Sequence, residues 1–130
     1  LTAYRRVLRD LRPKVFLLEN VHGLMFRGKD EGLRLLRDTI NAINAAEGTA
    51  YSFAVQKLNA ADYGVPQTRE RVFIVGERNG KVFRFPEATH RDPDAEEDLL
   101  DRAANRGPWM TAWDAIGDLE DDDDDPSLRV

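Results

Sequence analysis

The segment Val15-Phe16-Leu17-Leu18-Glu19-Asn20-Val21 joins a continuous apolar run to a carboxylate and an amide. An uninterrupted apolar run of this length is typical of a parallel strand that is covered on both faces. In open α/β sheets, ligands bind where the carboxyl ends of the strands lie. Glu19 and Asn20 are therefore candidate site residues. The alternative is that Glu19 turns into solvent and Asn20 only braces the following loop.

Helical periodicity flanks this predicted strand on both sides. Before it, apolar residues recur at helical spacing over residues 4–11, and Pro13 marks the end of that helix. After a glycine-containing loop, residues 30–47 again show helical spacing, and Gly48 is a plausible C-cap. The predicted strand therefore lies between two amphipathic helices.

Further strands are predicted in the middle of the chain. Residues 51–56 alternate between apolar and polar side chains, and residues 71–76 form a second continuous apolar run. Asn79-Gly80 is a strong turn signal that leads into a short predicted strand over residues 82–85, ended by Pro86. The order helix, strand, helix, strand, strand predicts an α/β fold with helices packed on a mixed sheet.

Charge divides the chain near residue 91. Residues 1–91 carry 16 Lys and Arg against 10 Asp and Glu, whereas residues 92–130 carry 3 against 14. The first part is expected to form the sheet and to tolerate a polyanion, while the second is expected to be acidic and partly disordered. Within the second part, residues 109–119 have the spacing of one short helix, and the aspartates at 121–125 cannot join a core.

Composition excludes several kinds of site. The chain has no cysteine, so it forms no disulfide and no cysteine-based zinc site. Its two histidines, His22 and His90, do not have the spacing of metal ligands. No apolar run approaches the roughly 20 residues that a membrane span needs, and no signal peptide opens the sequence. We expect a cytoplasmic, intracellular protein that binds neither a metal nor a membrane.

A second polar motif lies between two predicted strands, at Tyr63-Gly64-Val65-Pro66-Gln67-Thr68-Arg69-Glu70-Arg71. Arg71 enters a buried apolar run, where a guanidinium needs a specific acceptor. Glu19, Arg69 and Arg71 could then converge on one polar ligand. The alternative is that both arginines pair with nearby carboxylates on a solvated turn. Those carboxylates are Glu70, Glu77 and Asp62.

These two motifs resemble those of the C5-specific DNA cytosine methyltransferases. Glu19-Asn20-Val21 matches the family's Glu-Asn-Val after a buried strand, and Gln67-Thr68-Arg69-Glu70-Arg71 matches its Gln-x-Arg-x-Arg. The intervening Leu58–Pro66 is similar to the family's lead-in to the second motif. The resemblance covers about residues 1–119 and implies part of a Rossmann-like, S-adenosylmethionine-dependent methyltransferase sheet. Residues 1–91 would be the C-terminal half of that sheet.

The resemblance also implies a reaction and a set of roles. Cytosine C5 takes a methyl group only after a thiolate adds at C6 and the charge that builds on N3 and O2 is stabilised. By resemblance, Glu19 would hold the N3/N4 edge of a cytosine flipped out of duplex DNA, and Arg71 would reach O2. Arg69 would contact the DNA backbone or the same pocket. Supporting roles fall to Asn20, Val21 and Gln67.

Other parts of the catalytic machinery are expected outside this sequence. The Pro-Cys motif with the nucleophile, the Gly-rich motif that holds S-adenosylmethionine and the target-recognition region have no match here. We expect a central fragment that needs the remaining part of the methyltransferase and is inactive alone, with the cofactor pocket mostly elsewhere. The alternative is a non-catalytic DNA-binding or assembly subunit of a split or inactive methyltransferase.

Overall fold

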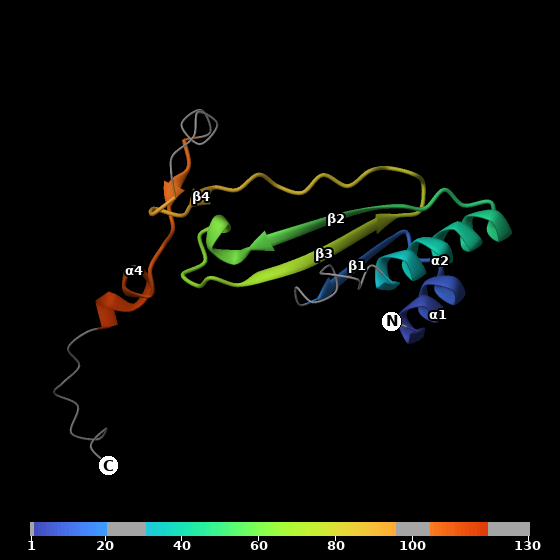
Figure 1. Cartoon of the computed structure of the whole chain (residues 1–130), viewed down its shortest axis with the longest axis horizontal. Coiled ribbons are helices and arrows are strands. Elements are labelled where there is room, and N and C mark those ends of the chain that lie inside the picture. The colour runs from blue at the N-terminus through green and yellow to red at the C-terminus, as the bar shows by residue number, and fades with distance from the viewer. Residues whose placement is uncertain (1, 21–30, 96–104, 120–130) are drawn as a thin grey trace, which may run out of the picture. The chain divides into compact units, whose positions relative to one another are not determined.

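The chain forms two units. The computed structural model describes residues 2–20, 31–95 and 105–119 (Figure 1). The first unit comprises residues 1–58 and 70–86, and the second comprises residues 59–69 and 87–130. The sequence predicts a boundary between residues 91 and 92, where the methyltransferase sheet would end. The division into two units does not test this boundary, so it stays a prediction.

The first unit is an α/β layer whose elements follow the predicted order. Its helices are α1 (Thr2–Leu11) and α2 (Glu31–Glu47), and its strands are β1 (Val15–Asn20), β2 (Ser52–Asn59) and β3 (Glu70–Glu77). The sheet order is β1-β3-β2, so β3 is the central strand. The predicted α/β class and the positions of both helices and these three strands are confirmed.

The sheet of the first unit is antiparallel around its central strand. β1 pairs with β3 in a register that runs from Val15 opposite Glu77 to Asn20 opposite Val72. β2 and β3 also run in opposite directions, as the arrows of Figure 1 show. The apolar run of β1 had suggested a parallel strand. That prediction is wrong, because β1 pairs with β3 in the antiparallel direction. In the described part of the chain, parallel pairing occurs only between two short strands of the second unit.

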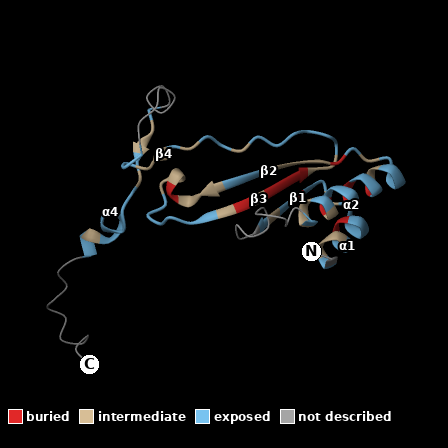
Figure 2. Ribbon diagram, viewed as in Figure 1, coloured by how far each residue is buried: buried red, intermediate tan, exposed pale blue. Residues whose placement is uncertain are grey.

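One face of this sheet carries the core. Phe16, Val72 and Ile74 pack against Leu8 of α1 and against one stripe of α2, and the buried residues gather where sheet and helices meet (Figure 2). That stripe consists of Leu36, Ile40 and Ile43. The Phe16 ring lies edge-on to Tyr4, with 6.4 Å between the ring centroids, and tilted against Tyr51, with 6.1 Å between the centroids. Burial of this aromatic cluster fixes both helices on one side of the sheet.

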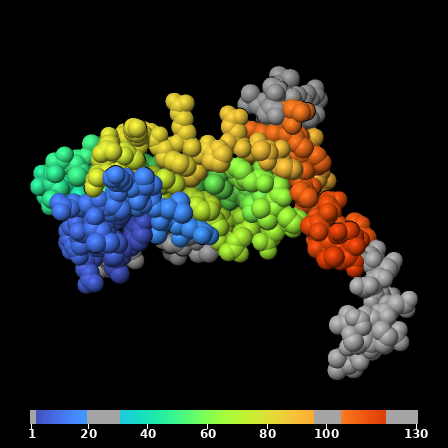
Figure 3. All heavy atoms as spheres, turned by 180° about the vertical axis from the view of Figure 1, so that it is seen from behind, coloured from blue at the N-terminus to red at the C-terminus, as the bar shows by residue number. Residues whose placement is uncertain are grey.

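The opposite face of β1 is open. Val15 and Leu17 are 57% and 58% exposed, and β1 lies at the surface of its unit when seen from behind (Figure 3). The prediction that this strand is covered on both faces is therefore wrong for the described structure. An apolar run indicates that side chains can be buried, but it does not identify what buries them.

The connection after β3 contains the predicted turn but not the predicted strand. The Glu77 carboxylate accepts the N–H groups of Asn79 and Lys81 at 2.7 and 3.0 Å, and Gly80 has φ +83°. No strand forms over residues 82–85, where Phe83 and Phe85 pack against each other edge-on. The prediction of a strand here is wrong.

The second unit is built around short elements. It contains the 3-10 turn η2 (Ala60–Tyr63), the parallel pair β4 (His90–Arg91) and β5 (Gly107–Pro108), the helix α4 (Ala112–Ile116) and the 3-10 turn η3 (Gly117–Leu119). A capping box formed by Thr111 and Asp114 starts α4. The prediction of a short helix within residues 109–119 is confirmed.

Candidate active site

Glu19 and Arg71 meet on the face of the sheet opposite the helices. Glu19 lies opposite Phe73 in the β1–β3 register, and Arg71 precedes Phe73 by two residues. Because side chains two apart on a strand share a face, Glu19 and Arg71 are diagonal neighbours. Arg71 Nε lies 3.5 Å from Glu19 Oε1, and the side chains are 23% and 49% exposed. The expected convergence of these two predicted residues is therefore observed.

The alternative partners of Arg71 are occupied elsewhere. The Glu70 carboxylate accepts from Lys57 at 2.8 Å, and its backbone carbonyl accepts Arg71 Nη1 at 2.7 Å. Glu77 caps the turn after β3, and Asp62 Oδ1 accepts the indole N–H of Trp109 at 2.9 Å. Of the carboxylates in the described ranges, Glu19 is the one that ion-pairs with Arg71. The geometry thus differs from a cluster of neighbouring charges on a turn.

Some predicted site residues can be placed only in part. Asn20 is the last residue of β1, and its backbone lies opposite Val72. Val21, His22 and the basic loop at residues 27–29 lie outside the described residues. The supporting roles predicted for Asn20 and Val21 therefore stay predictions.

Gln67 and Arg69 belong to the second unit and lie in the loop that follows η2. The backbone N–H of Gln67 donates to Val65 O at 2.7 Å, and the N–H of Arg69 donates to Asn59 Oδ1 at 2.9 Å. The side chains of Gln67 and Arg69 are both exposed. Sequence reasoning missed Asn59, although an asparagine directly before a helical turn is a recognised N-cap signal.

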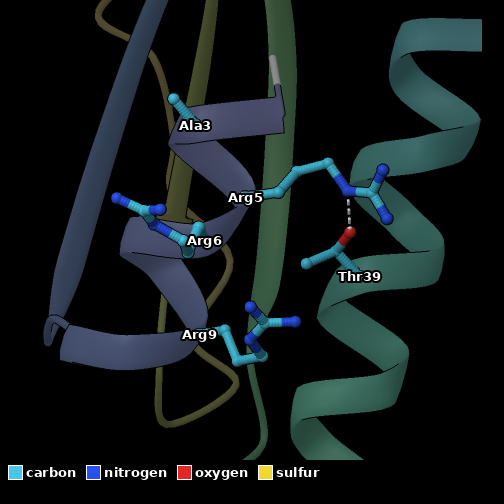
Figure 4. Close-up of a pocket in the computed structure, with 5 residues that line it drawn as sticks. All are labelled: Ala3, Arg5, Arg6, Arg9 and Thr39. Carbon is cyan, nitrogen blue, oxygen red and sulfur yellow. Dashed lines mark hydrogen bonds between the residues drawn. The ribbon is translucent and has the colours of Figure 1, made fainter.

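A pocket of arginines between α1 and α2 was not predicted. It has a volume of about 560 Å³ and is lined by Ala3, Arg5, Arg6, Arg9 and Thr39 (Figure 4). Arg5 Nε donates to Thr39 Oγ1, which itself donates to Leu35 O at 2.7 Å. Guanidinium groups suit an anion, and among the described residues that line the pocket the Thr39 hydroxyl is already hydrogen-bonded and no histidine or carboxylate is present.

Residues 2–20, 31–95 and 105–119 contain no group of histidines and carboxylates that could hold a metal ion. Within the same residues, no helix has the length and hydrophobicity needed to cross a bilayer.

Comparison with known proteins identifies relatives of the chain. The sequence profile of the C-5 cytosine-specific DNA methylases matches residues 1–128. The Type II methyltransferase M.AquIA of Picosynechococcus sp. is 41% identical over 118 residues, which are 89% of this chain and 48% of that protein. M.SacI of Streptomyces achromogenes is 36% identical over 121 residues, 93% of this chain and 29% of that protein.

Two further similarities cover smaller shares of the matched proteins. The Type II methyltransferase M.BspRI of Lysinibacillus sphaericus is 40% identical over 116 residues, 88% of this chain and 24% of that protein. A solved structure described as a DNA modification methyltransferase encoded within a prophage (E. coli) aligns with TM-score 0.45 and 33% identity, over 58% of this chain and 20% of that one. The chain thus spans about half the length of M.AquIA and less than a third of M.SacI and M.BspRI. It belongs to the C-5 cytosine-specific DNA methylase family.

Proposed function

We propose that this chain supplies the side chains that hold the target cytosine in a DNA (cytosine-5-)-methyltransferase. The observation that carries the proposal is the Glu19–Arg71 pair, with 3.5 Å between Oε1 and Nε, on the face of β1 and β3 opposite the helices. A carboxyl group and a guanidinium at this separation can both reach one planar base. The proposed substrate is a cytosine flipped out of duplex DNA.

The proposed chemistry is stabilisation of charge on the cytosine ring. When a thiolate adds to C6, negative charge builds on N3 and O2, and C5 becomes able to take a methyl group. Glu19 would hold the N3/N4 edge and, in its protonated form, donate a hydrogen bond toward N3, while Arg71 would donate to O2. The pairing of Arg71 with Glu19 would orient both groups before the base arrives. Arg69 would contact a DNA phosphate.

The nucleophile of this reaction must come from elsewhere in the enzyme. The chain contains no cysteine, so another segment has to bring the thiolate to C6 of the base. The remaining part of a methyltransferase is therefore the second proposed partner of this chain, in addition to DNA.

S-adenosylmethionine does not fit the arginine pocket that α1 and α2 form. The arginine pocket between α1 and α2 would repel the positive sulfonium group of the cofactor. We therefore assign no cofactor-binding residue to this chain and expect other segments of the enzyme to hold S-adenosylmethionine. The isolated chain should transfer no methyl group. Micromolar affinity for S-adenosylmethionine in calorimetry of the isolated chain would contradict this assignment.

The roles of the arginines can be tested in an M.SacI chimaera, in which this chain replaces the 121 residues of M.SacI that match it. Arg71→Ala should lower the single-turnover methylation rate by roughly 10²-fold, the scale of one lost oxyanion-type contact. Arg84→Ala is the matched control, because Arg84 is an exposed arginine of the same unit. If both variants methylate DNA at the same rate, the proposal that Arg71 donates to O2 of the cytosine is wrong.

A further inference from the structure

Asn59 closes the loop that carries Gln67 and Arg69. Its Oδ1 accepts the backbone N–H of Arg69 at 2.9 Å and the backbone N–H of Ala61 at 3.3 Å. The backbone adds a third link, because Ala60 N–H donates to Arg69 O at 3.0 Å. A single side chain therefore ties the first turn of the loop to its last residue.

The rest of this loop has a defined backbone. Gly64 adopts φ +83°, and its N–H donates to Ala61 O at 3.2 Å. The dihedral angle favours glycine here, and a Cβ on Gly64 would lie 2.9 Å from His90 Cε1, so the His90 ring would have to shift. The loop therefore follows one path between Asn59 and Arg69.

A second anchor lies at Asp62. The backbone N–H of Thr89 donates to Asp62 O at 2.9 Å, and the indole N–H of Trp109 donates to Asp62 Oδ1 at 2.9 Å. These contacts fix the early part of the loop against β4 and the residue after β5. Asn59, by contrast, contacts the end of the loop at Arg69, which is the residue before β3 begins.

We propose that Asn59 is a positioning residue for Arg69. By accepting the Arg69 N–H, it fixes the backbone from which the guanidinium extends toward a DNA phosphate. The inference rests on the proposed function, in which Arg69 makes that contact. The Arg69 side chain is exposed and forms no ion pair within the described ranges, so its direction depends on its backbone. Fixing that backbone in advance lowers the ordering cost of DNA binding.

The residue type at position 59 fits this role. The asparagine amide oxygen is a neutral acceptor, so it can hold a backbone N–H without placing a negative charge beside a DNA phosphate. Aspartate would keep the acceptor and add a charge, whereas leucine has a similar size and no acceptor. These two substitutions therefore separate the hydrogen bond from the volume of the side chain.

The first test uses the chain itself and measures amide hydrogen exchange at Arg69. Asn59→Leu should speed exchange of the Arg69 N–H by about five- to tenfold, as expected for the loss of one modest hydrogen bond. Asn59→Asp should leave that exchange slow. Asn44→Ala is the matched control, because Asn44 Oδ1 likewise accepts a backbone N–H, that of Tyr51 at 2.7 Å, but in the first unit.

The second test measures DNA affinity of the M.SacI chimaera across a salt series. Arg69→Ala should reduce the slope of log affinity against log salt by about 0.9, which corresponds to one phosphate. Asn59→Leu should reduce the slope in the same direction. Adding Asn59→Leu to Arg69→Ala should change it no further, because the positioned group is already gone. Asn44→Ala should leave the slope unchanged, even where it lowers stability.

The outcomes distinguish the inference from the proposed function. If Arg69→Ala leaves the salt slope unchanged, the proposed phosphate contact of Arg69 is wrong. If Arg69→Ala lowers the slope but Asn59→Leu either has no effect or adds its full effect in the double variant, Asn59 does not position Arg69. Unchanged exchange of the Arg69 N–H in Asn59→Leu would overturn the inference without any DNA measurement.

Discussion

The two faces of β1 differ sharply in what surrounds them. Phe16 is 5% exposed beneath α1 and α2, whereas the next residue, Leu17, points to the opposite side and is 58% exposed. The covered face contains the aromatic and aliphatic core, and the open face carries Glu19 beside Arg71. One face therefore stabilises the fold, while the other is available for chemistry. Substitutions on the two faces should affect different measurements.

The largest expected effect on stability comes from the covered face. Phe16→Ala should lower the free energy of unfolding by about 3–5 kcal/mol, the usual cost of removing a buried aromatic ring. Leu17→Ala should cost less than about 1 kcal/mol, because more than half of that side chain is already in water. Urea unfolding of the chain measures both values. Equal losses from the two neighbours would contradict the difference between the faces.

A somewhat smaller effect is expected at Gly76, which lies opposite Phe16 in the sheet. A Cβ on Gly76 would come within 2.1 Å of Phe16 Cε1 and Cζ, so Gly76→Ala forces the ring to move. We expect a loss of about 1–3 kcal/mol in the free energy of unfolding. In a Phe16→Ala background the same substitution should cost much less. Additive losses in urea unfolding of the double variant would mean that the two residues do not compete for space.

The smallest effect concerns Tyr51, whose hydroxyl donates to Pro13 O beneath the covered face. Burial raises the pKa of Tyr51, and this exceeds the opposing influence of Arg78 and Arg12. Because the folded pKa lies above the unfolded one, this stabilisation is complete below about pH 10 and is lost as the pH rises through the folded pKa. Tyr51→Phe should cost about 1 kcal/mol at neutral pH.

The pH dependence provides the measurement for Tyr51. Unfolding between pH 8 and pH 11 should show a shallower loss of stability in Tyr51→Phe than in the unsubstituted chain. Burial also raises the pKa of Tyr4, so Tyr4→Phe provides a reference with a second, partly buried phenol removed. If stability falls between pH 8 and pH 11 as steeply in Tyr51→Phe as in the unsubstituted chain, ionisation of this hydroxyl does not destabilise the fold.

Much of the fold follows from local patterns in the sequence. Apolar spacing identifies both helices, and the runs at 15–18 and 71–76 identify β1 and β3. The errors have a common cause. The run at residues 15–18 does not say which side is covered or which neighbour pairs, and the apolar residues at 82–85 do not guarantee a ladder. Both properties depend on contacts between distant segments.

The candidate site is predictable to a similar extent. The polar ends of two apolar runs predict that Glu19 and Arg71 meet, and the register of β1 with β3 explains how. Asn59 could have been recognised as an N-cap, but its bond to Arg69 joins residues ten positions apart through a closed loop. No local periodicity contains that information.

The central claim is that Glu19 acts on the target base and contributes little to the fold. Glu19→Gln in the M.SacI chimaera should lower the single-turnover methylation rate by roughly 10²-fold. The same substitution in the chain should change the free energy of unfolding by less than about 1 kcal/mol, because the ion pair is partly exposed. A near-normal methylation rate, or a rate loss explained by an equally large loss of folded protein, would contradict the claim.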